Sequence, residues 1–294
     1  AIELKSGFIS ALMNRWQLLY DKGQFDDALR DLDLCNTETS RAFSLETLYA
    51  LGNIDEIFKR IEMNAELDDC NIRMAAFSSF IAERENRDTA HKFCKNPLSF
   101  LYFSNLSSHL ENSNQFIKEL IDELSDLQTI WEPPERTTFK GFQTLPHINI
   151  FESPLDKMKE LESIIFLELD NYYSKFQNES CSYIKKWPSK KNLRGWHVIL
   201  KQQGCQTTHI HTSGWLSGVI YLKVIPSLGK NEGAIEFSLN GDNYSDLNSP
   251  KLTHEPELGD IIFFPSSLHH RTIPFSTDDD RIIISFDLQP DFSR

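Results

Sequence analysis

The chain has 294 residues, enough for two modest domains or one large one. Hydrophobic residues make up 40% of it and charged residues 25%, which is typical of a globular protein. The net charge of −13 argues against a nucleic-acid partner, because binding to a phosphate backbone needs a basic surface. No apolar run approaches the roughly 20 residues of a membrane span, so we expect no membrane partner either.

The termini and cysteines bear on the cellular compartment. The first ten residues, AIELKSGFIS, lack the basic start and apolar core of a secretory signal, although a removed leader before Ala1 stays open. The five cysteines are widely spaced and form no CxxC pair, so they predict neither a zinc knuckle nor a disulfide framework. We therefore expect a cytoplasmic protein.

Apolar periodicity predicts a helical domain over residues 1–128. The segment GQFDDALRDLD, which starts at Gly23, is echoed 29 residues later by GNIDEIFKRIE, which starts at Gly52. Such an echo is typical of stacked helical hairpins that bury one another's apolar faces. The pattern loosely resembles tetratricopeptide repeats, with a possible third copy at ENRDTAHKF; a generic helical bundle is the alternative. Either arrangement fits a scaffold that binds a protein partner.

The composition changes at WEPPERTTFKGFQT, where prolines, threonines and a glycine end the helical pattern. One further helix is predicted from Ser153 to Phe176, with Ser153 as its N-cap and Pro154 at its first position. Short β-branched and aromatic segments bounded by turn residues follow, among them WHVIL, GAIEFSL and RIIISFDL. They predict a sandwich or barrel over residues 129–294, so the fold class is α+β.

His209, Ile210 and His211 form the first candidate metal-binding motif. At the start of a predicted strand, alternate residues project to the same side, so both imidazoles can face one point. Imidazole is the commonest neutral metal ligand. The HxH signal is weak by itself because such pairs also occur by chance.

Two later features strengthen it. In GDIIFFPSSLHHRTIPF, His269 and His270 follow a buried strand in a turn, and only one of them is expected to be a ligand because adjacent side chains diverge. Arg281 begins the strand RIIISFDL, where a buried guanidinium needs a counter-charge. An anionic ligand could supply it. The alternative is a salt bridge to one of the preceding acidic residues, Asp278, Asp279 or Asp280.

An HxH pair, a distant histidine and an arginine separated from it by ten residues together resemble the double-stranded β-helix (jelly-roll) oxygenases that use Fe(II) and 2-oxoglutarate. The strings GFQT, GCQTTHIHTSGWLSGVIYL, FFPSSLHHRTIPF and RIIISFDLQP look like a bacterial group of these enzymes that often follows tetratricopeptide repeats. The resemblance covers roughly residues 130–292. It implies that His209, His211 and His270 bind iron and that Arg281 binds the far carboxylate of 2-oxoglutarate.

His211 stands where the wider superfamily has a carboxylate ligand; Glu232 or Glu236 is a less favoured source of one. Ser217 and Tyr221 could hydrogen-bond the cosubstrate if their strand has no bulge, with core packing as the alternative. The weaker candidates for the pocket wall are Gln143, Trp196 and Trp215.

The basic cluster from Lys185 to Arg194 is interpreted as a solvated loop, with an anionic substrate as the alternative.

The resemblance implies a 2-oxoglutarate-dependent dioxygenase. It would couple oxidative decarboxylation of 2-oxoglutarate by O₂ to C–H hydroxylation of a peptide or protein residue or of a small metabolite. No catalytic residue beyond the metal centre is predicted. The alternatives are a cupin-like three-histidine metalloenzyme that does not use 2-oxoglutarate, and a non-catalytic binding protein that acts through its repeats.

Overall fold

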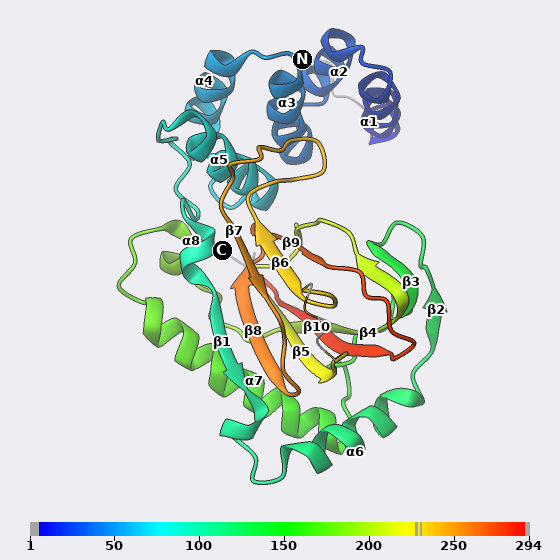
Figure 1. Cartoon of the computed structure of the whole chain (residues 1–294). Coiled ribbons are helices and arrows are strands. Elements are labelled where there is room, and N and C mark those ends of the chain that lie inside the picture. The colour runs from blue at the N-terminus through cyan, green and yellow to red at the C-terminus, as the bar shows by residue number, and fades with distance from the viewer. Residues whose placement is uncertain (1–5, 227–228, 230, 292–294) are drawn as a thin grey trace. The chain divides into compact units, whose positions relative to one another are not determined.

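The computed structural model describes residues 6–226, 229 and 231–291 (Figure 1). The described residues form two compact units, one from residues 6–95 and 239–249 and the other from residues 96–238 and 250–291. The prediction of a catalytic domain that begins at residue 129 stays a prediction. Within the described part of the chain, no helix has the length and apolar character needed to cross a membrane.

The first unit is built from helices that pack on their neighbours in sequence, with α3 contacting α2, α4 and α5. Gly23 and Gly52 occupy the turns before α2 and α4 with φ of +71° and +72°, a conformation that only glycine adopts without strain. The helices are α1 (Ser6–Asp21), α2 (Phe25–Cys35), α3 (Glu38–Ala50), α4 (Ile54–Asn64) and α5 (Ile72–Glu85).

The two echoed segments form α2 and α4. Ala28 and Leu32 are buried in α2, and the equivalent Ile57 and Ile61 are buried in α4, so the matched positions face the core. The relationship of these helices to tetratricopeptide repeats stays a prediction.

The prediction of helices through residue 128 is wrong for residues 86–112. Asn86 ends α5 in the left-handed conformation, and the proposed third copy continues as an irregular segment. Pro97 then begins a short 3₁₀ helix, η1 (Pro97–Phe100), and β1 (Tyr102–Asn105) pairs with a strand from the far end of the chain. Local periodicity could not reveal this pairing, because the hydrogen bonds of β1 are made to a partner more than 150 residues away.

Leu239–Ser249 belongs to the first unit although it connects two strands of the second. The Tyr244 ring packs against Phe77 and Phe80, with ring centroids 4.9 and 4.7 Å away. Asn243 donates from Nδ2 to the buried Glu46 carboxylate at 2.8 Å.

The second unit contains two sheets in which every pairing is antiparallel, with strand orders β1-β8-β5-β10-β4-β3-β2 and β7-β6-β9. Figure 1 shows β6 and β9 crossing over the larger sheet. The remaining strands are β2 (Thr129–Trp131), β3 (Thr138–Thr144), β4 (Leu193–Gln206), β5 (Leu216–Lys223), β6 (Ile235–Ser238), β7 (Lys251–His254), β8 (Asp260–Pro265), β9 (His269–Thr272) and β10 (Arg281–Leu288). Helices followed by a sheet-rich unit confirm the α+β class and are consistent with a jelly roll.

The other helical segments of this unit are η2 (Leu106–Ser108), α6 (Ser113–Ser125), α7 (Asp156–Phe176) and α8 (Ser182–Lys185). The predicted start of α7 at Ser153 is wrong: Ser153 has a φ of 61°, and Leu155 caps the helix. Instead of a local N-cap, the Glu123 side chain of α6 accepts from the backbone N–H groups of Lys157 and Met158.

Candidate functional site

One face of β10 carries the polar residues of the site. Arg281, Ile283, Ser285 and Asp287 alternate along this strand and therefore project to the same side. All four line one or both of the cavities described below. Arg281 and Asp287 lie toward opposite ends of this row.

The neighbouring strands extend this face. On β5, Ser217 is paired with Asp287 and Tyr221 with Ile283. The register between these pairs is continuous, so no bulge separates Ser217 from Tyr221, and both face the same side. On β4, Arg194 is paired with Asp287 and Trp196 with Ser285.

His209, His211 and His270 form the metal-binding candidate: one ligand atom from each lies within 4.8 Å of the other two. His209 and His270 exchange two backbone hydrogen bonds of 3.1 Å, which join the HxH segment to β9. The HxH segment lies before a turn, not on a strand as predicted, and β5 begins only at Leu216. His270 lies on β9, not in a turn, and the buried His269 is outside the cluster.

The hydrogen bonds of the three imidazoles favour the same tautomer in each ring. Every Nδ1 faces an acceptor, so Nδ1 carries the proton and the Nε2 lone pair is free to bind a metal. The acceptors are the Thr207 carbonyl for His209 (2.6 Å), the Asp287 carboxylate for His211 (2.6 Å) and the Leu268 carbonyl for His270 (3.1 Å).

Burial keeps two of these imidazoles neutral. Desolvation, with a smaller effect from His211, lowers the pKa of His209 to about 3. Desolvation, with smaller effects from His209 and His211, holds the pKa of His270 well below its usual value. Neutral imidazole is the form that binds metals.

Asp287 is held in place by Ser217 as well as by His211. The Ser217 hydroxyl donates to Asp287 Oδ1 at 2.7 Å and lies 2.8 Å from the Ser266 hydroxyl. Gly214 permits the close approach, since a Cβ there would lie 2.8 Å from the Asp287 carboxyl carbon. Ser217 is therefore grouped with His211 and not with Arg281, while Tyr221 is grouped with Arg281.

The Arg281 side chain is almost completely buried at 1% exposure. Its Nε donates to the Gly233 carbonyl at 3.1 Å, and its Cζ lies 4.9 Å from the centre of the Tyr221 ring. Neither Nη1 of Arg281 nor the Tyr221 hydroxyl has a hydrogen-bond partner among the described residues. Burial lowers the pKa of Arg281 and raises that of Tyr221 to about 12.

The alternative of a salt bridge to the preceding acidic residues is wrong. Asp280 pairs with Lys201 at 2.7 Å and Asp279 with Lys223 at 3.9 Å, and none of the three acidic residues pairs with Arg281. Glu232 and Glu236 are likewise engaged away from the histidines. Glu236 accepts from Arg271, and Glu232 accepts from the Ser276 backbone and hydroxyl.

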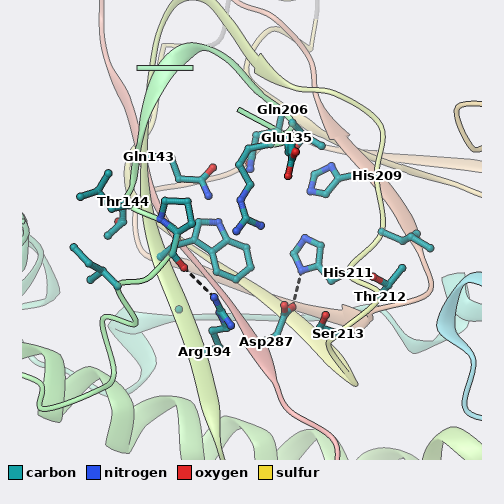
Figure 2. Close-up of a pocket in the computed structure, with 18 of the residues that line it drawn as sticks. Glu135, Gln143, Thr144, Arg194, Gln206, His209, His211, Thr212, Ser213 and Asp287 are labelled. Carbon is teal, nitrogen blue, oxygen red and sulfur yellow. Dashed lines mark hydrogen bonds and ion pairs between the residues drawn. The ribbon is translucent and has the colours of Figure 1, made fainter. Parts of the chain in front are cut away.

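Two cavities meet at the histidine cluster. The inner one is the smaller and is lined by all three histidines together with Tyr221 and Arg281. The outer one is larger and is lined by His209, His211 and residues of β3, β4 and the loop between β2 and β3. Figure 2 shows Gln143 and Arg194 across this outer cleft from His209 and His211.

Two of the three predicted wall residues, Gln143 and Trp196, line the outer cleft, and the Trp196 ring lies 5.3 Å from that of His211. Trp215 does not: it is buried and its Nε1 donates to the Tyr183 carbonyl. The sequence interpretation missed Asp287, although it stands an even number of residues after Arg281 on the same strand. Same-face counting from Arg281 could have found it.

The fold and the site together combine an antiparallel two-sheet unit, three histidines positioned to bind a metal, and a buried arginine without a counter-ion. Residues 194–287 match a family profile described as "Putative 2OG-Fe(II) oxygenase". The matched segment contains the three histidines, Arg281 and Asp287, so this part of the chain is similar to 2-oxoglutarate- and Fe(II)-dependent oxygenases. No curated protein matches the chain.

Solved structures with similarity to the chain include a prolyl-4-hydroxylase from Pseudomonas putida, with 11% identity over 65% of this chain and 92% of that one and a TM-score of 0.45. HygX from Streptomyces hygroscopicus, with nickel and 2-oxoglutarate bound, has 13% identity over 65% and 83% and a TM-score of 0.41. A prolyl hydroxylase from Trichoplax adhaerens, in complex with a hypoxia inducible factor peptide, has 13% identity over 75% and 90% and a TM-score of 0.45.

Proposed function

We propose that this protein is an Fe(II)- and 2-oxoglutarate-dependent oxygenase that hydroxylates a C–H bond of a substrate bound in the outer cleft. One observation carries the proposal. Three metal-ready imidazoles and a buried guanidinium without a counter-ion line the same inner cavity. The substrate is a peptide or protein residue or a small metabolite, and the helical unit is a candidate site for a protein partner.

The histidine cluster fits an iron ion with open coordination positions. His209, His211 and His270 each direct a free Nε2 lone pair away from their Nδ1 acceptors, and imidazole is a suitable ligand for Fe(II). A structural zinc site normally has four protein ligands. The three histidines supply only three, which favours a site that also binds small molecules.

The polar lining of the inner cavity suits a carboxylate of the cosubstrate. Burying an unpaired guanidinium costs several kcal/mol. A carboxylate that accepts two parallel hydrogen bonds from the guanidinium offsets this cost. Arg281 meets this condition, and the free hydroxyl of Tyr221 stands beside it to donate a further hydrogen bond. A direct contact of Ser217 with 2-oxoglutarate stays a prediction, and the hydroxyl already supports Asp287 and His211.

When bound, iron and 2-oxoglutarate would supply the oxidative chemistry with O₂, and the protein contributes orientation and exclusion of water. Asp287 holds the His211 ring in one tautomer. The Phe264 ring lies 4.6 Å from that of His270 and covers the cluster with an apolar surface. No further catalytic residue is proposed.

The proposal is tested by anaerobic titration of the apo-protein with Fe(II) and then 2-oxoglutarate, following the visible metal-to-ligand charge-transfer band. The band should appear only when both are present. His270→Ala should abolish it by removing a ligand, whereas His269→Ala, at the neighbouring buried position, should keep it. Arg281→Ala should weaken 2-oxoglutarate binding about tenfold to hundredfold, the usual range for a lost charged hydrogen bond. Arg30→Ala, which removes an exposed ion pair of the helical unit, should leave it unchanged.

A cupin-like three-histidine enzyme is the second candidate, favoured by the lack of a carboxylate in the described histidine cluster. Stoichiometric iron binding without the band, or an Arg281→Ala variant with normal 2-oxoglutarate affinity, would move the assignment to that class. A protein that binds no metal at all would point to the non-catalytic alternative.

A further inference from the structure

The arginines of this acidic protein divide into two groups. Eleven of its twelve arginines lie in the described residues, and eight of these form ion pairs with carboxylates: Arg15, Arg30, Arg41, Arg60, Arg73, Arg84, Arg87 and Arg271. The other three are Arg136, Arg194 and Arg281, and all three line the cavities at the histidine cluster. The inner cavity accounts for Arg281. Arg136 and Arg194 line the outer cleft, and the proposed function so far assigns them no role.

Arg194 is fixed at the wall of this cleft. It lies on β4 and is paired with Asp287 of β10, which accepts a hydrogen bond from Nδ1 of His211. Hydrogen-bonded strands are only about 4.8 Å apart. Its Nη2 donates to the Pro146 carbonyl at 2.9 Å, an interaction that orients the side chain without neutralising its charge (Figure 2). The positive charge of Arg194 is thereby held one strand away from Asp287, the hydrogen-bond partner of the candidate ligand His211.

Further hydrogen-bond donors line the rest of the cleft. Gln143 is buried, and its Oε1 accepts from the Thr138 hydroxyl at 2.8 Å, which leaves its amide N–H groups for a ligand. Arg136 reaches the cleft from the loop between β2 and β3. Among the lining residues the carboxylates are Asp287, already bonded to His211, and Glu135. The wall therefore offers two unpaired cations and a free amide against one unpaired anion.

We propose that the substrate carries a carboxylate that is bound by Arg194 and Arg136, so that a carbon near this carboxylate faces the histidine cluster. This inference rests on the proposed function and adds to it the chemical class of the substrate. A guanidinium binds a carboxylate through two parallel hydrogen bonds, which fixes the position of the ligand as well as its charge. Gln143 supplies a further donor. The carboxylate belongs either to a free organic acid or to an acidic side chain of a peptide.

The test uses the protein loaded with Fe(II) and saturating 2-oxoglutarate under anaerobic conditions, so that Arg281 is already occupied. The probes are small carboxylic acids, each matched with its own primary amide, and capped alanine pentapeptides with a central glutamate or glutamine. Binding is measured by tryptophan fluorescence, to which Trp196 in the cleft contributes, and by perturbation of the charge-transfer band. Acids should bind at least about tenfold more tightly than their amides. A preference confined to the small acids or to the peptide identifies the source of the carboxylate.

Arg194→Gln and Arg136→Gln should each reduce this preference, and the double variant should abolish it while keeping the native affinity for 2-oxoglutarate. Arg30→Gln, which removes the same charge from an exposed ion pair in the helical unit, is the matched control and should keep the preference. If no acid binds more tightly than its amide, or if the preference survives in the double variant, the inference is overturned.

The two proposals fail separately. A charge-transfer band without any acid preference leaves the oxygenase proposal intact and removes this inference. If the band never forms, but the fluorescence response still shows a preference that depends on Arg194, the selectivity of the cleft stands and the oxygenase proposal falls.

Discussion

Asp287 is the residue on which the orientation of His211 depends. Its carboxylate accepts a hydrogen bond from Nδ1 of His211. A carboxylate in this position also makes the imidazole a stronger metal ligand. Asp287→Asn removes the charge while keeping the shape, and we expect metal affinity to fall about tenfold to hundredfold, the usual effect of losing such a partner. The measurement is competition with a chelator of known affinity, alongside a thermal unfolding curve of the apo-protein.

Asp280→Asn is the control, because it removes the same charge from a partly exposed pair with Lys201 at the other end of β10. Native metal affinity in the Asp287→Asn variant, with an unchanged dependence on pH, would show that Asp287 only packs against the histidine.

At the same scale, the sequence predicted individual residues where one strand or one short motif contained the information. The HxH pair, His270 and Arg281 could be selected in this way, and so could Tyr221 by same-face counting. The grouping of Ser217 with Asp287 and the convergence of Arg136 and Arg194 on one cleft depend on strand pairing between distant segments. No local pattern contains that register.

At the scale of elements, the pairing of β5 with β10 depends on a glycine. A Cβ at Gly218 would overlap the fully buried Phe286 ring of β10. Replacing a strand glycine with alanine gains at most about 1 kcal/mol from reduced backbone freedom, whereas overpacking a filled core costs about 1–3 kcal/mol. Gly218→Ala should therefore destabilise the protein, as measured by chemical denaturation.

A second substitution separates this clash from other causes. Phe286→Leu shortens the ring that faces Gly218, so the double variant should be less destabilised than the sum of the two single variants. Simple additivity would mean that the two residues do not interact and that the glycine has another role.

Elements were predicted best where their stabilising contacts are local. The turn glycines and buried positions of α2 and α4, and the body of α7, follow from helical periodicity. The strand β1 was missed because it pairs with β8, and the start of α7 was misplaced because the capping carboxylate comes from α6. In both cases the deciding hydrogen bonds come from a different part of the chain.

At the scale of the whole molecule, a buried histidine makes stability depend on pH. His197 on β4 is 3% exposed, and neither of its ring nitrogens has a hydrogen-bond partner among the described residues. Burial lowers its pKa to about 4, against an ordinary value of about 6.5. Below pH 6.5 the unfolded chain therefore binds a proton that the folded chain does not.

The stability contributed by neutral His197 is thus complete above pH 6.5 and is lost as the pH falls toward 4. The shift corresponds to about 3 kcal/mol across this interval. His197→Leu removes the titrating group, so its free energy of unfolding should fall less steeply between pH 6.5 and 4 than that of the native protein. The comparison uses denaturant unfolding of the metal-free proteins at several pH values, in which His209 and His270 contribute equally to both curves. Parallel curves would mean that His197 binds a proton without opening the sheet, which its burial between paired strands argues against.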